Sequence, residues 1–291
     1  MRFKFMEIRL NENSELHIGS EAAYVAFPGW NVPRNVRYGY STRMLGVSKG
    51  IYASMNLGLN RGDDVSLVKE NYRRICNAVG IPMESLVLSR QTHLCNVRKV
   101  TKADCGNGIT RENAFADIDA LMTNEPGVPL TIFTADCVPV FLYDPVKRVI
   151  ALAHAGWRGT VGGICRETVL AMRKEYGSEP KDILAAIGPS ICRSCFEIGP
   201  EVAECFREAF PMPVDAGSGV LYSGEGDRFY ADLWRANEYM LSDAGVLPEH
   251  ITVSGLCTMC RTDLFFSHRA TAGRRGSNAG FLMLNEDNDE Q

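Results

Sequence analysis

Hydrophobic residues occur along this chain either at helical spacing or in short continuous runs. The clearest helical spacing lies in the first third of the chain. One face of a 3.6-residue period is formed by Val68, Tyr72, Ile75 and Val79. Asp63 and Asp64 precede this stretch, where negative charge favours the positive end of a helix dipole. Gly80 and Pro82 follow it and stop helical growth. We therefore predict a helix that starts at Asp63 and Asp64 and ends at Gly80.

Shorter apolar runs predict strands that alternate with helices. The strand-like runs cover residues 6–10, 22–27, 36–41, 87–88, 97–100, 120–123, 130–134, 139–143, 149–154, 183–188, 251–254 and 280–284. Further helices are predicted over residues 160–176, 200–210 and 232–244. Residues 46–62 are rich in Gly, Ser and Asn, which predicts an ordered loop, and residues 286–291 predict a frayed tail. Because no repeat or Pro-rich linker divides the chain, we expect one α+β domain over residues 1–291, with the strands of residues 1–42 integral to it.

Composition and charge exclude several classes of protein. The chain has 291 residues, 45% of them hydrophobic and 23% charged, which excludes disorder for most of its length. Its 31 basic and 35 acidic residues give a charge of −4, so no basic excess exists to displace counterions from nucleic acid. The most apolar stretch, residues 128–143, contains Asp136 and is shorter than the ~20 residues of a membrane span. The N-terminus lacks the apolar core of a signal peptide, so we expect a cytoplasmic protein.

A predicted β-hairpin around Asp144 and Pro145 carries the most informative residues. Asp followed by Pro favours the first two positions of a type I turn between two apolar runs. If Asp144 faces Lys147, the numbers of facing residues add up to 291, and Cys137 then faces His154. Their Cβ atoms would lie about 4.5–5.5 Å apart.

A facing Cys and His has three interpretations. The pair can bind Zn²⁺ or copper, it can be a nucleophile with its base, or it can be structural. The five histidines of the chain are His17, His93, His154, His250 and His268. Among them His93, in a segment flanked by apolar residues, is the best candidate for a third ligand, because His17 and His250 have polar neighbours.

Several motifs make the chain resemble one family. They include Gln91-Thr92-His93, Thr134-Ala135-Asp136-Cys137-Val138-Pro139, Ala153-His154-Ala155-Gly156-Trp157-Arg158-Gly159 and Phe265-Phe266-Ser267-His268-Arg269. The matching segments extend over about residues 38–284, and the Ala-Asp-Cys and His-Ala-Gly-Trp-Arg-Gly segments are highly specific. On these residues the chain resembles the YfiH/YlmD family, whose members have been described as polyphenol oxidases with a laccase domain, purine nucleoside phosphorylases and peptidoglycan editing factors. Met55 and His268 are small departures from the family pattern, which usually has Leu and often Tyr there.

The resemblance implies that His93, Cys137 and His154 bind one metal ion, usually zinc and sometimes copper, in a four-layer α/β/β/α sandwich. Three protein ligands leave the fourth tetrahedral position open, which is typical of catalytic zinc. Such a site suits the hydrolytic deamination of adenosine, because zinc deaminases attack a carbon of the base. Asp136, beside a ligand, is a candidate for ordering water or a ligand histidine, and the alternative is a hydrogen-bonded turn residue.

Phosphorolysis of a nucleoside also requires a site for an anion. Arg side chains and Gly-rich backbone at the start of a helix bind phosphate well. Residues 156–160 lead into a predicted helix, so Arg158 is the main candidate for phosphate binding. Further candidates are Arg43, Arg269, Arg274 and Arg275.

Four other cysteines form two Cys-x-x-Cys pairs, Cys192 with Cys195 and Cys257 with Cys260. This spacing is that of a four-thiolate zinc site, but the 61 residues between the pairs exceed the ~15–20 of a usual zinc ribbon. The family does not generally depend on such a site. We therefore expect packed thiols, with a second metal ion as the alternative.

The leading hypothesis, whose substrates come from the resemblance, is a zinc-dependent purine nucleoside phosphorylase that also deaminates adenosine. It would act on adenosine, inosine or methylthioadenosine with phosphate, releasing the base and a ribose 1-phosphate. Alternatives are a thiol hydrolase that uses Cys137 and His154 on an amide such as a peptidoglycan precursor, and a copper polyphenol oxidase. Expected partners are a nucleoside and phosphate, not nucleic acid or a membrane, and we expect a monomer or a homodimer.

Overall fold

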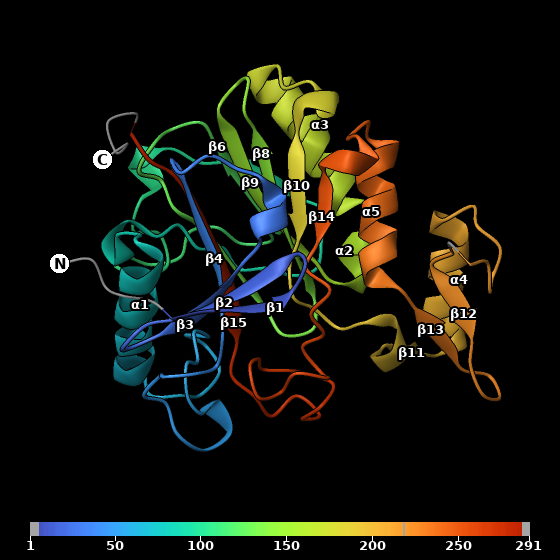
Figure 1. Cartoon of the computed structure of the whole chain (residues 1–291), viewed down its shortest axis with the longest axis horizontal. Coiled ribbons are helices and arrows are strands. Elements are labelled where there is room, and N and C mark those ends of the chain that lie inside the picture. The colour runs from blue at the N-terminus through green and yellow to red at the C-terminus, as the bar shows by residue number, and fades with distance from the viewer. Residues whose placement is uncertain (1–5, 218, 287–291) are drawn as a thin grey trace.

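The computed structural model describes residues 6–217 and 219–286 and contains two large sheets (Figure 1). In spatial order the first sheet contains β1 (Met6–Asn11), β2 (Ser14–Ile18), β3 (Ala23–Ala26), β4 (Val36–Ser41), β15 (Asn278–Leu284) and β7 (Leu130–Thr134). The second contains β14 (Ile251–Val253), β10 (Leu184–Ile187), β8 (Val138–Asp144), β9 (Val149–Ala155), β6 (Ala120–Thr123) and β5 (Val97–Lys99). The N-terminal strands are therefore part of the first sheet.

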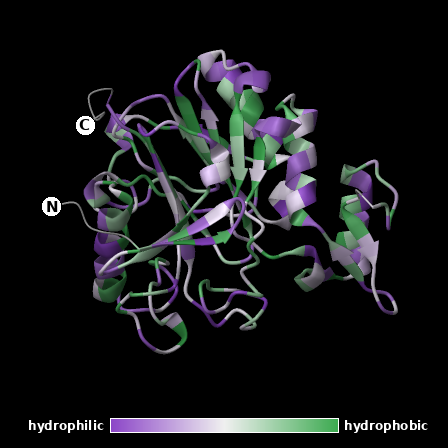
Figure 2. Ribbon diagram, viewed as in Figure 1, coloured by the Kyte–Doolittle hydropathy of each residue, from purple (hydrophilic) through white to green (hydrophobic). Residues whose placement is uncertain are grey.

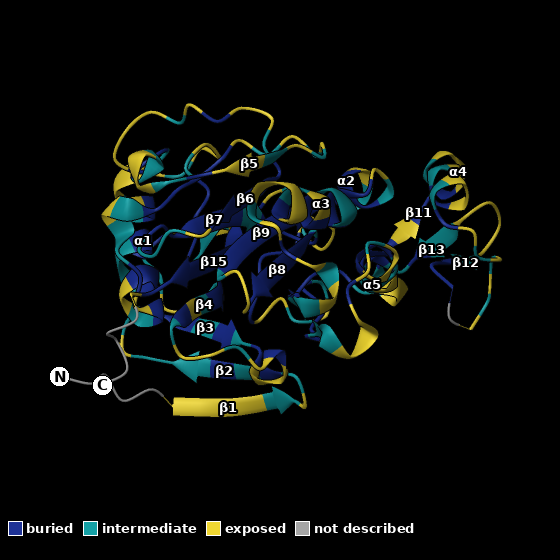
Figure 3. Cartoon of the chain, turned by 90° about the horizontal axis from the view of Figure 1, so that it is seen from above, coloured by how far each residue is buried: buried dark blue, intermediate teal, exposed yellow. Residues whose placement is uncertain are grey.

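Alternating side chains let each sheet contribute to two cores. In β15, Leu282 and Leu284 enter the core between the two sheets, whereas Phe281 faces helix α1 (Val65–Val79). In β9, Leu152 enters the core between the sheets, whereas Ala151 faces the helices on the other side. This two-residue period is what a strand imposes on its side chains. Figure 3 shows the central strands buried and β1 exposed at the edge of its sheet.

The helices cover the outer faces of the two sheets. Helix α1 packs on β3 and β4, while α3 (Ile164–Tyr176) packs on β9 and against α5 (Leu233–Asp243). Figure 2 shows hydrophobic and hydrophilic residues mixed along these helices, as expected of helices with one apolar face. The predicted α+β class and single domain are confirmed. Within the part of the chain that the structure describes, no helix has the length and apolar character needed to cross a membrane.

Helix α1 confirms the end signals in the sequence. Asp64 is its N-cap, and its carboxylate accepts the backbone N–H of Ser66 at 2.8 Å. Gly80 closes the helix in the left-handed conformation at φ 77°, which glycine adopts without strain. The predicted tail at residues 286–291 lies outside the described residues, except for Glu286.

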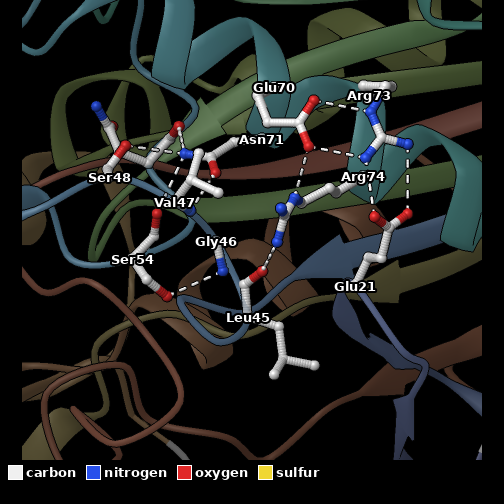
Figure 4. Close-up of polar contacts among 11 residues, drawn as sticks. Glu21, Leu45, Gly46, Val47, Ser48, Ser54, Glu70, Asn71, Arg73 and Arg74 are labelled. Atoms are coloured by element: carbon white, nitrogen blue, oxygen red, sulfur yellow. Dashed lines mark hydrogen bonds and ion pairs between the residues drawn. The ribbon is translucent and has the colours of Figure 1, made fainter.

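The predicted ordered loop at residues 46–62 is held by one buried side chain of α1. The Nδ2 atom of Asn71 donates to the hydroxyl of Ser48 at 2.9 Å and to the carbonyls of Ser54 and Asn56. Its Oδ1 atom accepts the backbone N–H of Val47 at 2.8 Å (Figure 4). A single amide thus satisfies four backbone or hydroxyl groups, which explains why a loop rich in Gly and Ser is ordered.

Several regions differ from the predicted elements. A single helix was expected over residues 160–176, but Gly163 at φ 83° separates α2 (Trp157–Val161) from α3. A small sheet of β11 (Glu197–Ile198), β13 (Phe229–Ala231) and β12 (Leu221–Ser223) was not predicted, nor was β2. The small sheet lies beside α4 (Pro200–Ala209), at the right of Figure 1. The strands of the small sheet have only two or three residues, which is too short to show a period in the sequence.

The register of the β8–β9 hairpin corrects the prediction. Asp144 pairs with Val149, not with Lys147, so the numbers of facing residues add up to 293. The carboxylate of Asp144 accepts the backbone N–H groups of Val146 and Lys147 at 2.8 and 3.0 Å. These bonds close a four-residue turn that ends at Arg148 with φ 53°. The turn is two residues longer than a direct Asp–Lys pairing allows.

The predicted direct facing of Cys137 and His154 is therefore wrong. Pro139 is the residue that pairs with His154, and Val138 pairs with Ala155. Because the register shifts by two residues, both side chains keep the same face of the hairpin. The two groups consequently still approach one another, along a diagonal.

Candidate metal centre

Three side chains from different segments converge at one end of the second sheet. His93 comes from the loop before β5, Cys137 directly precedes β8, and His154 lies near the end of β9. One ligand atom of each lies within 4.8 Å of those of the other two. His93 Nε2 is 3.8 Å from Cys137 Sγ, and the two imidazole rings are 4.9 Å apart at 72°.

The donor set fits a tetrahedral metal ion. Zinc bonds of about 2.0 Å to nitrogen and about 2.3 Å to sulfur separate neighbouring ligand atoms by roughly 3.5 Å. The observed separation between His93 and Cys137 is close to this value. Two imidazoles with one thiolate suit zinc and also copper, so the donor types do not select one metal.

Asp119, which sequence reasoning missed, organises this centre. It is fully buried, and its Oδ1 atom lies 2.8 Å from Nδ1 of His154. An ionised carboxylate only accepts, so Nδ1 of His154 carries the proton and Nε2 keeps its lone pair for a metal. Asp119 also accepts the backbone N–H groups of Thr92, His93 and Leu94 at 2.9–3.2 Å. The same carboxylate thus orients one ligand and holds the segment that carries another.

Two features of the sequence point to Asp119 as the carboxylate partner of a ligand histidine. A histidine that binds a metal usually donates its other ring nitrogen to a carboxylate or carbonyl. Asp119 stands immediately before the apolar strand β6, where a charged residue needs a partner to be buried.

Gly156 makes room for the three ligands. Continuing the register of the hairpin places Gly156 opposite Cys137. A Cβ atom at Gly156 would lie 2.6 Å from Cδ2 of His93 and 3.0 Å from Sγ of Cys137. Any larger residue would push the ligands apart, so glycine is required here for close approach.

The charges of Cys137 and His154 stabilise one another. Burial disfavours the charged form of both groups, but the neighbouring imidazoles outweigh it and lower the pKa of Cys137 to about 6. Burial likewise opposes the charge on His154, but Cys137 and Asp119 raise its pKa to about 9. The opposed shifts favour the ionised form of Cys137, which is the form of sulfur that a metal ligand needs.

A cavity of about 670 Å³ opens onto the three ligands. This volume lies within the ~300–1,000 Å³ that small-molecule sites occupy. Its walls carry four arginines and one phenylalanine, Arg61, Arg90, Arg111, Arg275 and Phe133. Phe133 is further tied to the loop of His93, because the amide of Gln91 exchanges two hydrogen bonds of 2.8 Å with its backbone.

Two of these arginines form a concentrated positive charge. Arg275 is 8% exposed, and its Nη1 atom donates to the carbonyl of Gly276 and the hydroxyl of Ser277, while its Nε has no partner. Arg61 donates its Nε to the same Ser277 hydroxyl at 2.9 Å. Burial and the charge of Arg61 lower the pKa of Arg275 to about 10, so Arg275 remains charged at neutral pH. A buried guanidinium with an unused donor beside another cation favours binding of an anion.

The other predicted phosphate ligands do not line the cavity, and two of them are hydrogen-bonded elsewhere. Arg43 donates Nε and Nη2 to the carbonyl of Ala53, and Arg269 donates Nη1 to the carbonyl of Glu197. Arg158 is exposed on the five-residue helix α2. Of the predicted candidates, the structure brings only Arg275 to the cavity; Arg43, Arg158, Arg269 and Arg274 are not among its lining residues.

Asp136 lies in a hydrogen-bonded turn. It is buried, has φ 83°, and its carboxylate accepts the hydroxyl of Thr258 and the backbone N–H of Arg269, both at 2.6 Å. Its own carbonyl accepts the N–H of Ile191 at 3.0 Å. The carboxylate that orients a ligand imidazole is that of Asp119 instead.

Comparisons with known proteins agree in sequence and in fold. Residues 37–285 match the sequence profile of the family described as multi-copper polyphenol oxidoreductase laccase. Purine nucleoside phosphorylase YlmD of Bacillus subtilis is 38% identical over 87% of this chain and 90% of that protein. Adenosine deaminase RL5, from an unknown prokaryotic organism, is 36% identical over 80% of this chain and 86% of that protein. The crystal structure of YlmD from Geobacillus stearothermophilus superimposes with a TM-score of 0.86 at 35% identity, covering 93% of this chain and 99% of that one.

Proposed function

This chain belongs to the multi-copper polyphenol oxidoreductase laccase family, together with YlmD, and on that basis we propose that it is a zinc-dependent purine nucleoside phosphorylase. Its substrates would be adenosine, inosine or methylthioadenosine with phosphate, and adenosine deamination would be a second activity. The observation that carries the proposal is the position of the buried Arg275 on the wall of the cavity that His93, Cys137 and His154 line.

Phosphorolysis places two demands on the residues of this cavity, of which the first is to bind and orient the phosphate. A phosphate oxygen forms a bond to C1′ of the ribose while the bond from C1′ to the base nitrogen breaks. The electron pair stays with the base, which takes up the proton that hydrogen phosphate releases. Arg275 and Arg61 meet the first demand, because their guanidinium groups hold and orient the anion. Arg275 and Cys137 line the same cavity, so an anion held by Arg275 would lie in the same site as the three ligands.

The second demand is stabilisation of charge at the reacting nucleoside. When bound, a zinc ion with three protein ligands supplies a Lewis acid and an open position where water loses a proton near neutral pH. Asp119 keeps His154 in the tautomer that leaves the lone pair of Nε2 free, so that His154 would be able to hold such an ion. The same arrangement supports deamination of adenosine, in which water replaces the amino group and ammonia leaves.

The decisive experiment combines metal analysis with product analysis. Purified protein is assayed for bound metal and then incubated with adenosine, with and without phosphate. Adenine that forms only with phosphate demonstrates phosphorolysis, and inosine that forms without phosphate demonstrates deamination. Formation of neither product from protein that contains the metal would overturn the proposal. Loading the metal-free protein with zinc or with copper in parallel identifies the active metal.

A thiol hydrolase is the second candidate, and one observation favours it. Cys137 and His154 have the opposed pKa shifts of a nucleophile and its base. A bound metal ion masks the thiolate, so the two functions differ in how iodoacetamide reacts. Slow alkylation of Cys137 in the metal-loaded protein, and fast alkylation after chelation, supports the phosphorylase. Fast alkylation in both states, with loss of an amidase activity, supports the hydrolase.

A copper polyphenol oxidase fits the donor set less well. Coupled copper centres need many imidazoles, whereas the chain has five histidines and no His-x-His pair. Among the described residues, the candidate centre brings two of them together, His93 and His154.

A further inference from the structure

A second group of side chains with metal-binding chemistry lies outside the cavity. The Sγ atoms of the four cysteines of the two Cys-x-x-Cys pairs lie within 4.8 Å of one another, and these cysteines are Cys192, Cys195, Cys257 and Cys260. None of the four is among the residues that line the cavity. All four are free thiols, and Cys257 is buried whereas Cys260 is exposed.

The topology of the second sheet explains how pairs so distant in sequence meet. Strands β10 and β14 are parallel neighbours, with Ile187 beside Val253. Both chains leave the sheet at the same end, and Ser190 still pairs with Cys257 beyond the strands. The 61 intervening residues form the small sheet, α4 and α5, which return the chain to the neighbouring strand (Figure 1). The long spacing between the two pairs therefore reflects a crossover between parallel strands. It is not an argument against a metal site that the two pairs share.

The local backbone supports negative charge on one of the four sulfur atoms, that of Cys257. Sγ of Cys257 accepts the backbone N–H groups of Cys192 and Cys260 at 3.3 and 3.4 Å. Such donors stabilise a thiolate. Sγ of Cys195 lies 3.5 Å from Sγ of Cys260. That is far longer than the ~2.05 Å of a disulfide and near the roughly 3.8 Å that separates two thiolates on a tetrahedral zinc ion.

From this geometry we propose that Cys192, Cys195, Cys257 and Cys260 bind a second zinc ion, which has a structural role. Four protein ligands complete the tetrahedral shell and leave no position for a substrate. Zinc is favoured because soft thiolates in a tetrahedron select it and paired Cys-x-x-Cys motifs are its usual ligands.

This ion would join the two loops that contact Asp136, the residue before the ligand Cys137. Ile191 of the first loop donates its N–H to the carbonyl of Asp136, and Thr258 of the second donates its hydroxyl to the carboxylate of Asp136. Asp136 immediately precedes the ligand Cys137. The four-cysteine site therefore fixes two of the three contacts that position Asp136, the third being the backbone N–H of Arg269. Its zinc acts on the first centre through structure alone.

Zinc content of the full-length protein tests the proposal. The wild-type protein, purified under reducing conditions, should contain one more equivalent of zinc than a Cys195→Ser/Cys260→Ser variant. A Cys205→Ser variant is the matched control, because Cys205 lies on α4 outside the cluster. Its zinc content should equal that of the wild type. Equal zinc content in the wild type and the double variant would overturn the proposal.

Cobalt spectroscopy gives a readout that needs no cysteine variant. A His93→Asn protein, whose catalytic centre is impaired, is stripped of metal and titrated with Co²⁺. A sulfur-to-cobalt charge-transfer band that saturates at one equivalent, with the intensity of four thiolates, supports the proposal. A band no stronger than one thiolate would overturn it, as would disulfides between these cysteines in reduced preparations. Iron in place of zinc in the purified protein would overturn the identity of the ion.

Discussion

The two cysteine-containing centres of this protein share metal-binding chemistry and differ in what they leave open. At the first, Cys137 and two histidines meet on the wall of a cavity, and a buried carboxylate orients one imidazole. At the second, four thiols meet between two loops outside the lining of that cavity. Three ligands with space beside them suit a reacting molecule, whereas four ligands close the coordination sphere.

The difference teaches that ligand number and surroundings, more than ligand type, separate a catalytic from a structural centre. Arg61 and Arg275 place positive charge on the wall of the cavity that the first centre lines, whereas none of the four cysteines lines that cavity. The following variants should affect catalysis strongly at the first centre and stability mainly at the second.

The largest expected effect is that of His93→Asn. Asparagine tolerates the left-handed backbone of this position, at φ 66°, so the variant should fold. Loss of one ligand should lower kcat/KM for adenosine phosphorolysis by at least about 1,000-fold, because a bound metal supplies several kcal/mol and each ~1.4 kcal/mol is tenfold. Circular dichroism and metal analysis accompany the assay. A variant that unfolds would instead indicate a zinc protein whose first centre is structural.

Asp119→Asn should have the next largest effect. The amide can no longer act as a charged acceptor for Nδ1 of His154, so metal affinity or activity should fall about 10–100-fold. Asp117→Asn is the matched control, since Asp117 is exposed and bonds the hydroxyl of Thr92. Competition with a chelator measures the zinc affinity of both variants. Equal affinities would show that Asp119 does not act through the ligand.

Arg275→Met should affect phosphate more than nucleoside. A hydrogen bond to a charged group contributes about 1.5–3 kcal/mol, so KM for phosphate should rise roughly 10–100-fold. Phosphate-free deamination of adenosine should change little. Arg158→Met, at an exposed position on α2, should leave both reactions unchanged. A rise in the KM for phosphate in Arg158→Met, with none in Arg275→Met, would restore Arg158 as the phosphate ligand.

The smallest effect on catalysis is expected from Cys195→Ser/Cys260→Ser. The loss of a structural ion should lower the melting temperature by roughly 5–10 °C, which corresponds to about 2–3 kcal/mol. Turnover well below the melting temperature should stay within about threefold of the wild type, because the reacting groups are untouched. Differential scanning calorimetry and initial rates on the same preparation separate the two quantities. A loss of activity like that of His93→Asn, at unchanged stability, would contradict the assignment of structural and catalytic centres.

Much of the local structure follows from short-range physics that the sequence displays. The two ends of α1, at Asp64 and Gly80, depend on neighbouring residues only, so both ends were predicted. The approximate bounds of the central strands, such as β9, are local as well. The three ligands His93, Cys137 and His154 were assigned through motifs that resemble a family, and the structure brings their donor atoms together.

What the tertiary structure decided depends on contacts between distant residues. The Asp144 turn set the hairpin register, and a buried Asp119 proved to bind both the segment of His93 and the ring of His154. Arg61 and Arg275 share Ser277 only because the loop held by Asn71 packs against the end of the chain. Local periodicity carries no information about such pairings, since a crossover between parallel strands can bring any two loops together. The sequence therefore determined which residues have metal-binding chemistry and, through the family motifs, the three residues of the first centre. Only the fold decided that the four cysteines of the distant pairs lie together as a second group.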